Sequence, residues 1–318
     1  MREADLLERI GKLFPRAGDD AAVIGRQVIT NDMLIEDVDF TRAMPLHFIA
    51  RKSLAANLSD LAAMGSRPMY GIVALGLPGW VDAERLVEEF AAAASEQRIE
   101  IIGGDVSRAD KLIVSVTAIG ETDRPLLRSG AQPGDRIYVS RPIGASMAGL
   151  FLLQHGFDFD GKATDGRPLT YGEREFVASA IRRHVDPEPE VELGMKLAAM
   201  PQVRSCIDVS DGLSTDLHHL CAASHAGADI ERERIPVFPD LAAAALRFGI
   251  DVPQCVLHGG EEYALIFTSS LRESELSVRV GRPVYAIGRV SRDPGVRLDG
   301  VPLEALGWDH FAHHPTSY

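Results

Sequence analysis

Short apolar runs that end in aspartate and glycine recur along the chain, and this feature limits the possible folds more than any other. The run "IEIIGGD" ends at Asp105, and "IDVSDGL" spans 207–213. Such runs predict strands that end in turns, because aspartate and glycine favour turn conformations. Ala-rich segments with helical patterns lie between them, at 46–64 and 81–97. We therefore expect a mixed α/β fold, with strands that both follow one another and alternate with helices.

The length of the chain and one turn predict two domains. At 318 residues the chain is long enough for two domains of ordinary size. The segment "RSGAQPGDRIYVS" (128–140) places a Pro-Gly-Asp turn before a new strand. We therefore predict an N-terminal α/β domain over 1–136 and a C-terminal α/β domain over 137–318.

Local patterns predict several elements of the first half. The segments "AAVI" and "QVITND" predict a short hairpin that turns at Gly25-Arg26. In the helix expected at 46–64, Leu54, Leu58 and Leu61 form a narrow apolar stripe. The run "MYGIVALGL" (69–77) predicts a buried strand.

Composition limits the partners of the protein. It has 46% hydrophobic and 25% charged residues, as expected of a soluble globular protein. The net charge of −13 argues against nucleic acid or an anionic membrane surface as a partner. No apolar run approaches the roughly 18 residues of a membrane helix. The three cysteines are scattered, which is typical of a reducing compartment, so we expect a cytoplasmic protein that binds small molecules.

Six aspartates share one local setting, a strand end or helix beside small residues. Taken singly, each could serve only as a turn or N-cap residue, and Asp211 before Gly212 is a plausible cap. Two carboxylates about 4 Å apart, however, repel by about 4 kcal/mol at an effective dielectric constant near 20. Clustered carboxylates would need a cation, and Mg²⁺ prefers oxygen ligands and often bridges to phosphate. The six are Asp20, Asp32, Asp60, Asp105, Asp208 and Asp211.

Common nucleotide and zinc-protease motifs are absent from the sequence. It contains no GxxxxGK[ST] loop, no GxGxxG between a strand and a helix, no kinase HRD loop and no HExxH. If the protein binds ATP, it therefore does so through an unusual site rich in metal ions.

The order and spacing of seven motifs resemble thiamine-monophosphate kinases, which belong to the aminoimidazole-ribonucleotide-synthetase-like superfamily. The resemblance runs from about residue 5 to residue 311, and NLSDLAAMG and DVSDGL are its most specific parts. It implies an N-terminal α/β domain and a larger C-terminal one with a cleft between them. It also implies a homodimer whose N-terminal sheets pair into a barrel. The motifs are GDDAAV (18–23), TNDMLIEDVDF (30–40), NLSDLAAMG (57–65), GGDVSR (103–108), RSGAQPGD (128–135), IDVSDGL (207–213) and GGEEYAL (259–265).

The resemblance implies a reaction and a set of site residues. Such enzymes transfer the γ-phosphoryl group of ATP directly to the phosphate of thiamine monophosphate, with several Mg²⁺ ions and no covalent nucleophile. By motif, Gly104, Asp105, Arg128 and Ser210 would contact ATP. The positions of Asp39, Glu261 and Trp308 would contact the acceptor. The metal ligands would come from Asp20, Thr30, Asn31, Asp32, Asp60, Asp105, Asp208 and Asp211.

Departures from the family pattern concern mainly the acceptor. Asp39 stands where the family usually has histidine, and Asn31 stands where threonine or serine is common. Two alternatives therefore remain: another ATP-dependent enzyme of the superfamily, or a non-catalytic nucleotide-binding homologue. Selenophosphate synthetase needs a reactive cysteine near its N-terminus. The first cysteine of this chain is Cys206, which argues against that enzyme.

Overall fold

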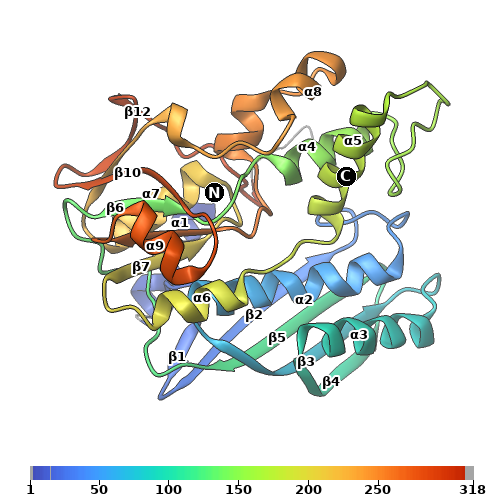
Figure 1. The fold of residues 1–318 in the computed structure, drawn as a ribbon. Helices are drawn as coiled ribbons and strands as arrows, with labels where there is room; N and C mark the ends of the chain where they lie inside the picture. Colours follow the sequence, from blue (N-terminus) through green and yellow to red (C-terminus); the bar gives the residue numbers. More distant parts are fainter. Residues whose placement is uncertain (1–2, 15, 312–318) are drawn as a thin grey trace.

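The computed structural model describes residues 3–14 and 16–311 (Figure 1). The elements up to residue 121 are α1 (Glu3–Leu13), β1 (Ala22–Ile24), β2 (Gln27–Ile35), α2 (Leu46–Ala63), β3 (Arg67–Leu77), α3 (Ala83–Gln97), β4 (Glu100–Arg108) and β5 (Ile113–Glu121). The later elements are β6 (Arg136–Val139), α4 (Ala145–Gln154), α5 (Tyr171–Val185), α6 (Val191–Ala198), β7 (Val203–Asp208), α7 (Leu213–Ala223), β8 (Gly227–Ile230), a 3₁₀ turn (Arg232–Arg234), α8 (Leu241–Phe248), a π-helical turn (Gln254–His258), β9 (Leu265–Ser269), α9 (Glu273–Val280), β10 (Tyr285–Ser291), β11 (Gly295–Leu298) and β12 (Val301–Pro302).

The described strands form two sheets, and the fold is mixed α/β. The first has the order β1-β2-β5-β3-β4, and the second has the order β12-β11-β8-β10-β6-β9-β7. The predicted hairpin is confirmed: β1 and β2 pair antiparallel, with Ile24 opposite Gln27. In Figure 1 the first sheet lies below α2 and α3, and the second lies above them. None of the described helices has the length and apolar character needed to cross a bilayer.

Helix α2 occupies the boundary between the two sheets and corrects one prediction. It contacts β2 and β5 on one side and α6 and β7 on the other. A single narrow apolar stripe is therefore the wrong description, because the helix is buried around most of its circumference. The polar side chains of Lys52, Asn57 and Ser59 are buried with the leucines.

The first sheet has one covered face and one open face, so the strand predicted at 69–77 is present as β3 but is buried on one side only. Val114 and Val116 of β5 lie in the core, whereas Tyr70 and Ile72 of β3 are more than one-third exposed. We call the uncovered side the open face. Asn31 points to this side, since its amide donates to the Thr117 hydroxyl at 2.9 Å.

The second sheet carries the "IDVSDGL" motif at its edge. Strand β7 ends at Asp208, and α7 begins five residues later at Leu213. Strand β9 pairs antiparallel with β7, with Leu265 opposite Asp208. This pairing places the loop before β9, which contains the "GGEEY" segment, beside the end of β7. The sequence patterns did not predict α8, α9, β11 or β12, which are short.

Candidate active site

Three aspartates from distant parts of the chain meet between the two sheets. Asp20 precedes β1, Asp60 lies in the last turn of α2, and Asp208 ends β7. One carboxylate oxygen from each lies within 4.8 Å of the others. We call these three residues the carboxylate cluster.

Neighbouring polar groups hold the cluster in place. The Thr30 hydroxyl donates to Asp60 Oδ2 at 2.5 Å, and the Ser59 hydroxyl donates to Asp208 Oδ2 at 2.5 Å. Side chains alternate between the faces of a strand, so Thr30 and Asp32 of β2 point toward α2 while Asn31 points away. The backbone N–H of Asp32 donates to Asn57 Oδ1 at 3.0 Å.

Arg128 supplies fixed positive charge beside the cluster. Its Nη2 and Nε donate to Asp20 Oδ1 at 2.8 Å and 3.1 Å. Its backbone N–H donates to the Asp19 carboxylate at 2.6 Å. Burial opposes the charge on the guanidinium, but the attraction of Asp20 outweighs it and raises the pKa of Arg128.

One guanidinium does not offset the repulsion among these carboxylates. Burial, and then repulsion from Asp20, raise the pKa of Asp208 to about 8. Burial, and then Asp39 and Asp20, raise the pKa of Asp32 to about 6. Burial and three neighbouring carboxylates raise the pKa of Asp60 well above its usual range. Without a bound cation, Asp208 and Asp60 therefore tend to hold protons at neutral pH.

The donor set of the cluster fits Mg²⁺. Carboxylate and hydroxyl oxygens are the ligands that this ion prefers. Asp20 Oδ2 is buried, and no described residue donates a hydrogen bond to it, so one oxygen of the cluster lacks a partner. A cation bound there would satisfy that oxygen and remove the repulsion that raises the pKa values.

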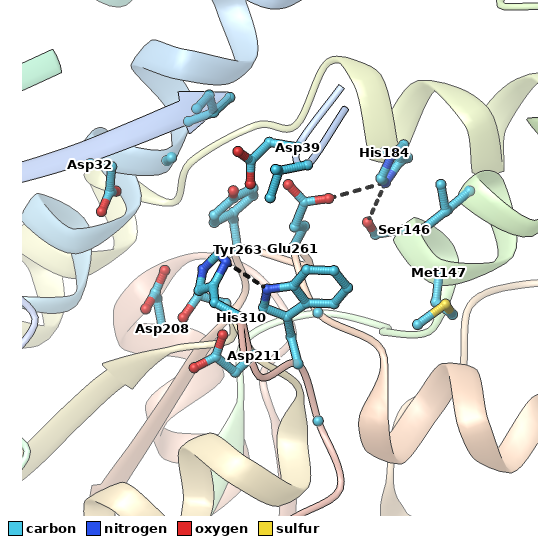
Figure 2. Close-up of a pocket in the computed structure, with 18 of the residues that line it drawn as sticks. Asp32, Asp39, Ser146, Met147, His184, Asp208, Asp211, Glu261, Tyr263 and His310 are labelled. Atoms are coloured by element: carbon cyan, nitrogen blue, oxygen red, sulfur yellow. Dashed lines mark hydrogen bonds and ion pairs between the residues drawn. The ribbon is translucent and has the colours of Figure 1, made fainter. Parts of the chain in front are cut away.

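A cavity of about 280 Å³ extends from the cluster toward α4 and α5. Figure 2 shows Asp32 and Asp208 on one side of it and Ser146, Met147 and His184 on the other. We call Asp20, Asp32, Asp60, Asp208 and Arg128 the carboxylate end of the site.

Asp39, Glu261 and His184 line another part of the cavity, and the buried Lys52 contacts the first two; we call these four residues the lysine end. Lys52 Nζ donates to Glu261 Oε1 at 2.7 Å, and His184 Nδ1 lies 3.4 Å from Glu261 Oε2. Asp39 Oδ2 accepts the backbone N–H of Ile35 at 2.7 Å, so one of its oxygens is already engaged. Burial raises the pKa values of Asp39 and Glu261, and Lys52 lowers both.

Two loops join these ends, and their glycines allow close backbone contact. The backbone N–H of Glu261 donates to the Ser210 carbonyl at 2.7 Å. A Cβ atom on Gly260 would lie 2.5 Å from that same carbonyl oxygen, so glycine is required there. Trp308 lines the cavity, and its backbone N–H donates to the Asp211 carbonyl at 3.0 Å.

Asp216 organises the first of these loops, and the sequence analysis missed it. Its Oδ2 accepts the N–H groups of Asp211 and Gly212, at 3.2 Å and 3.0 Å. Asp211 is therefore not the cap of α7; the helix is preceded by Gly212, and Asp216 in its first turn binds the free N–H groups. The Asp211 side chain is left to line the cavity.

The fold of the single chain does not bring every predicted residue to the cluster. Gly104 and Asp105 lie on β4, at the opposite edge of the sheet from β1. Asp105 pairs with Ala74, and Ala74 pairs with Ser115, whose side chain contacts that of Asn31 on the open face. Directly paired residues point to the same side of a sheet, so the side chain of Asp105 also lies on the open face. Three strand spacings separate β2 from β4, or about 14 Å. Their contact with metal or ATP remains a prediction.

Comparison with known proteins identifies the family. Residues 18–122 match the N-terminal domain of AIR synthase related proteins, and residues 132–300 match the C-terminal domain. The thiamine-monophosphate kinase of Escherichia coli is 35% identical over 93% of this chain and 91% of its own. The thiamine-monophosphate kinase of Rhodopirellula baltica is 34% identical over 94% of this chain and 91% of its own length. The chain belongs to the thiamine-monophosphate kinase family.

A solved structure of the same family supports the fold. AaThiL complexed with AMPPCP and TMP is 29% identical to this chain, covers 98% of it and 97% of its own length, and has a TM-score of 0.85. The two-domain fold implied by the motifs is therefore confirmed. AMPPCP is an ATP analogue, so this relative binds a nucleotide analogue together with TMP.

The sequence patterns did not reveal Lys52 and Ser59, two buried residues of α2, although the sequence contains a signal for the first. The segment from 46 to 63 is rich in small and apolar residues on all sides, which is typical of a helix buried all round. A lysine in such a helix needs an anionic partner, which points to Lys52. Ser59 has no comparable signal, because serine is common in buried and exposed helices alike.

Proposed function

We propose that this protein phosphorylates thiamine monophosphate to thiamine diphosphate, with ATP as the phosphoryl donor. The observation that carries the proposal is the cavity itself, in a chain of this family. One end holds the buried carboxylate cluster beside Arg128, and the other presents Glu261 and Trp308. The γ-phosphoryl group passes in line to a phosphate oxygen of the acceptor, and ADP leaves.

The carboxylate end would hold Mg²⁺ through Asp20, Asp60 and Asp208, with Thr30 and Asp32 beside them. Bound Mg²⁺ ions would neutralise the phosphates of both substrates and stabilise the charge of the transition state. Arg128 fixes the orientation of Asp20 through two hydrogen bonds. Ser59 and Thr30 fix the other two carboxylates, so the cluster is rigid before substrate arrives.

The lysine end would bind the organic part of the acceptor. Glu261 presents a carboxylate, 29% exposed, that can accept hydrogen bonds from an amine. The indole of Trp308 offers an aromatic face that attracts the cationic thiazolium. The nucleophile is an oxygen of the acceptor phosphate, which is already ionised, so no side chain has to remove a proton.

The open face of the first sheet supports a homodimer. Its exposed apolar side chains include Met33, Tyr70 and Ile72, which a second copy could bury. Such pairing would also give Asn31, Gly104 and Asp105 a route into the partner's site, which they cannot reach within one protomer. We place the protein in the cytoplasm, where its three buried cysteines would remain reduced.

A product assay tests the proposal. Purified protein is incubated with ATP, MgCl₂ and thiamine monophosphate, and thiamine diphosphate is followed by chromatography. Thiamine replaces the monophosphate in the control. Diphosphate formed from the monophosphate alone supports the function. ADP released without any diphosphate would contradict it.

A further inference from the structure

Lys52 is a cation with no exposed side-chain area in the boundary between the two domains. It lies on the second turn of α2, and its ammonium group contacts Glu261 and Asp39, which line the cavity. A buried ammonium is costly unless anionic or carbonyl oxygens surround it. The partners of Lys52 therefore show which groups it serves.

All three N–H donors of Lys52 have acceptors. Nζ lies 2.7 Å from Glu261 Oε1 and 2.9 Å from Glu261 Oε2, so it contacts both oxygens of that carboxylate. It also donates to the backbone carbonyl of Asp39 at 3.1 Å. One lysine thus joins the loop after β2 to the loop before β9, and each loop carries a residue assigned to the acceptor.

Glu261 needs such an anchor because its loop has an unusual backbone. Its φ angle is 56°, in the left-handed region that non-glycine residues seldom adopt. The loop is held by the hydrogen bond from its N–H to the Ser210 carbonyl, but that bond does not orient the side chain. The orientation of the carboxylate comes from Lys52 and from His184, which lies 3.4 Å away.

Lys52 also determines the charge of this end. The largest influence that keeps Glu261 ionised is its contact with Lys52. Burial and the nearby ammonium lower the pKa of His184 well below its usual range, so this imidazole is neutral at physiological pH. The ammonium of Lys52 is therefore the charge that balances Glu261.

We propose that Lys52 is a positioning residue for the acceptor: it fixes Glu261 as an ionised hydrogen-bond acceptor for the amine of the substrate. This inference rests on the proposed function. Lys52 does not touch the carboxylate cluster, so it contributes to the selection and binding of the acceptor and not to the binding of ATP.

Steady-state kinetics of Lys52→Met test the inference. Methionine has a similar length and no charge. We expect KM for thiamine monophosphate to rise about 10- to 100-fold, the range for losing a hydrogen bond to a charged group. KM for ATP and the Mg²⁺ dependence should stay within about twofold of wild type, since no contact at the carboxylate end changes. Ser53→Ala is the matched control, because Ser53 is equally buried on α2 and donates only to the Ile49 carbonyl.

A double variant separates positioning from a structural role. Lys52→Met leaves Glu261 without its cation, whereas Lys52→Met with Glu261→Gln removes both charges and should fold even if the single variant does not. If Lys52 acts through Glu261, the double variant has the same KM for thiamine monophosphate as Glu261→Gln alone. The inference fails if the effects of the two substitutions multiply, or if KM for both substrates rises equally. Failure of wild-type protein to form thiamine diphosphate would instead contradict the proposed function.

Discussion

The two ends of the cavity treat negative charge in opposite ways. At the carboxylate end, four aspartates share a single guanidinium, and one oxygen of Asp20 has no partner among the described residues. At the lysine end, Lys52 contacts both oxygens of Glu261, and His184 remains neutral. The first end needs a cation from outside the chain, whereas the second carries its own. This difference supports the proposal that metal ions and phosphates bind at the carboxylate end and the organic part of the acceptor at the lysine end.

The largest effect should follow from removing one ligand of the cluster. We expect Asp60→Asn to lower kcat at least about 100-fold, because losing a ligand costs more than losing an outer-shell partner. The fold should survive, since repulsion within the cluster falls. Activity is measured across a Mg²⁺ titration, and Asp165→Asn in an exposed loop is the control. Wild-type activity in Asp60→Asn would contradict a role for the carboxylate cluster in metal binding.

Asp105 tests whether the carboxylate end is complete in one protomer. We expect Asp105→Asn to lose activity, although Asp105 lies on the open face and cannot reach its own cluster. If a second copy supplies it, mixing Asp60→Asn and Asp105→Asn protomers restores one intact site in each mixed dimer. Random mixing should then recover about one-quarter of wild-type activity. Mixed dimers without activity would show that Asp105 does not act across the interface.

The lysine end should give a smaller and more selective effect. Glu261→Gln keeps the shape of the side chain but removes its charge. We expect KM for thiamine monophosphate to rise about 10- to 100-fold, while kcat and KM for ATP change little. Initial rates with each substrate varied in turn provide the measurement. An equal rise of KM for ATP would mean that the two ends are not separable.

The smallest effect concerns stability and pH. Without metal, the pKa values of Asp208 and Asp32 in the folded protein are about 8 and 6. In the unfolded chain the same groups release their protons near pH 4. The stability of the metal-free protein therefore falls as pH rises from about 4 to 8. Mg²⁺ competes with those protons for the carboxylates. Mg²⁺ should therefore raise Tm by about 5 °C at pH 8 and by less at pH 6. Thermal denaturation with and without MgCl₂ measures the difference, and an equal shift at both pH values would contradict it.

The sequence predicted which helices and strands carry the site, but it did not predict how those elements pack against one another. Alternation along β2 is a local property, so it separates Thr30 and Asp32 from Asn31 as soon as the strand is recognised. The meeting of Asp20, Asp60 and Asp208 depends on the packing of two sheets around α2, and spacing along the chain does not determine that packing. The family resemblance had assigned all three residues to metal binding, and the structure places them within one cluster.

The residues that the sequence did not reveal mostly support others. Asp216 binds backbone N–H groups of the loop at Asp211, and Asp211 itself was the expected cap. Lys52 lies on α2, a helix that was expected to be buried on one side only. Both assignments need the tertiary environment, because their partners lie on other turns or elements. Asp105 is the reverse case: its motif is clear, but one protomer does not give it a partner at the cluster.

Locating the bound metal ions by crystallography would show whether the carboxylate cluster holds them. Crystals grown with MnCl₂ in place of MgCl₂, and with AMPPCP, would give an anomalous signal from each bound ion. We predict a strong peak among the carboxylates of Asp20, Asp60 and Asp208, and none beside Lys52. A map with no peak at the cluster, or with its strongest peak at the lysine end, would contradict the account.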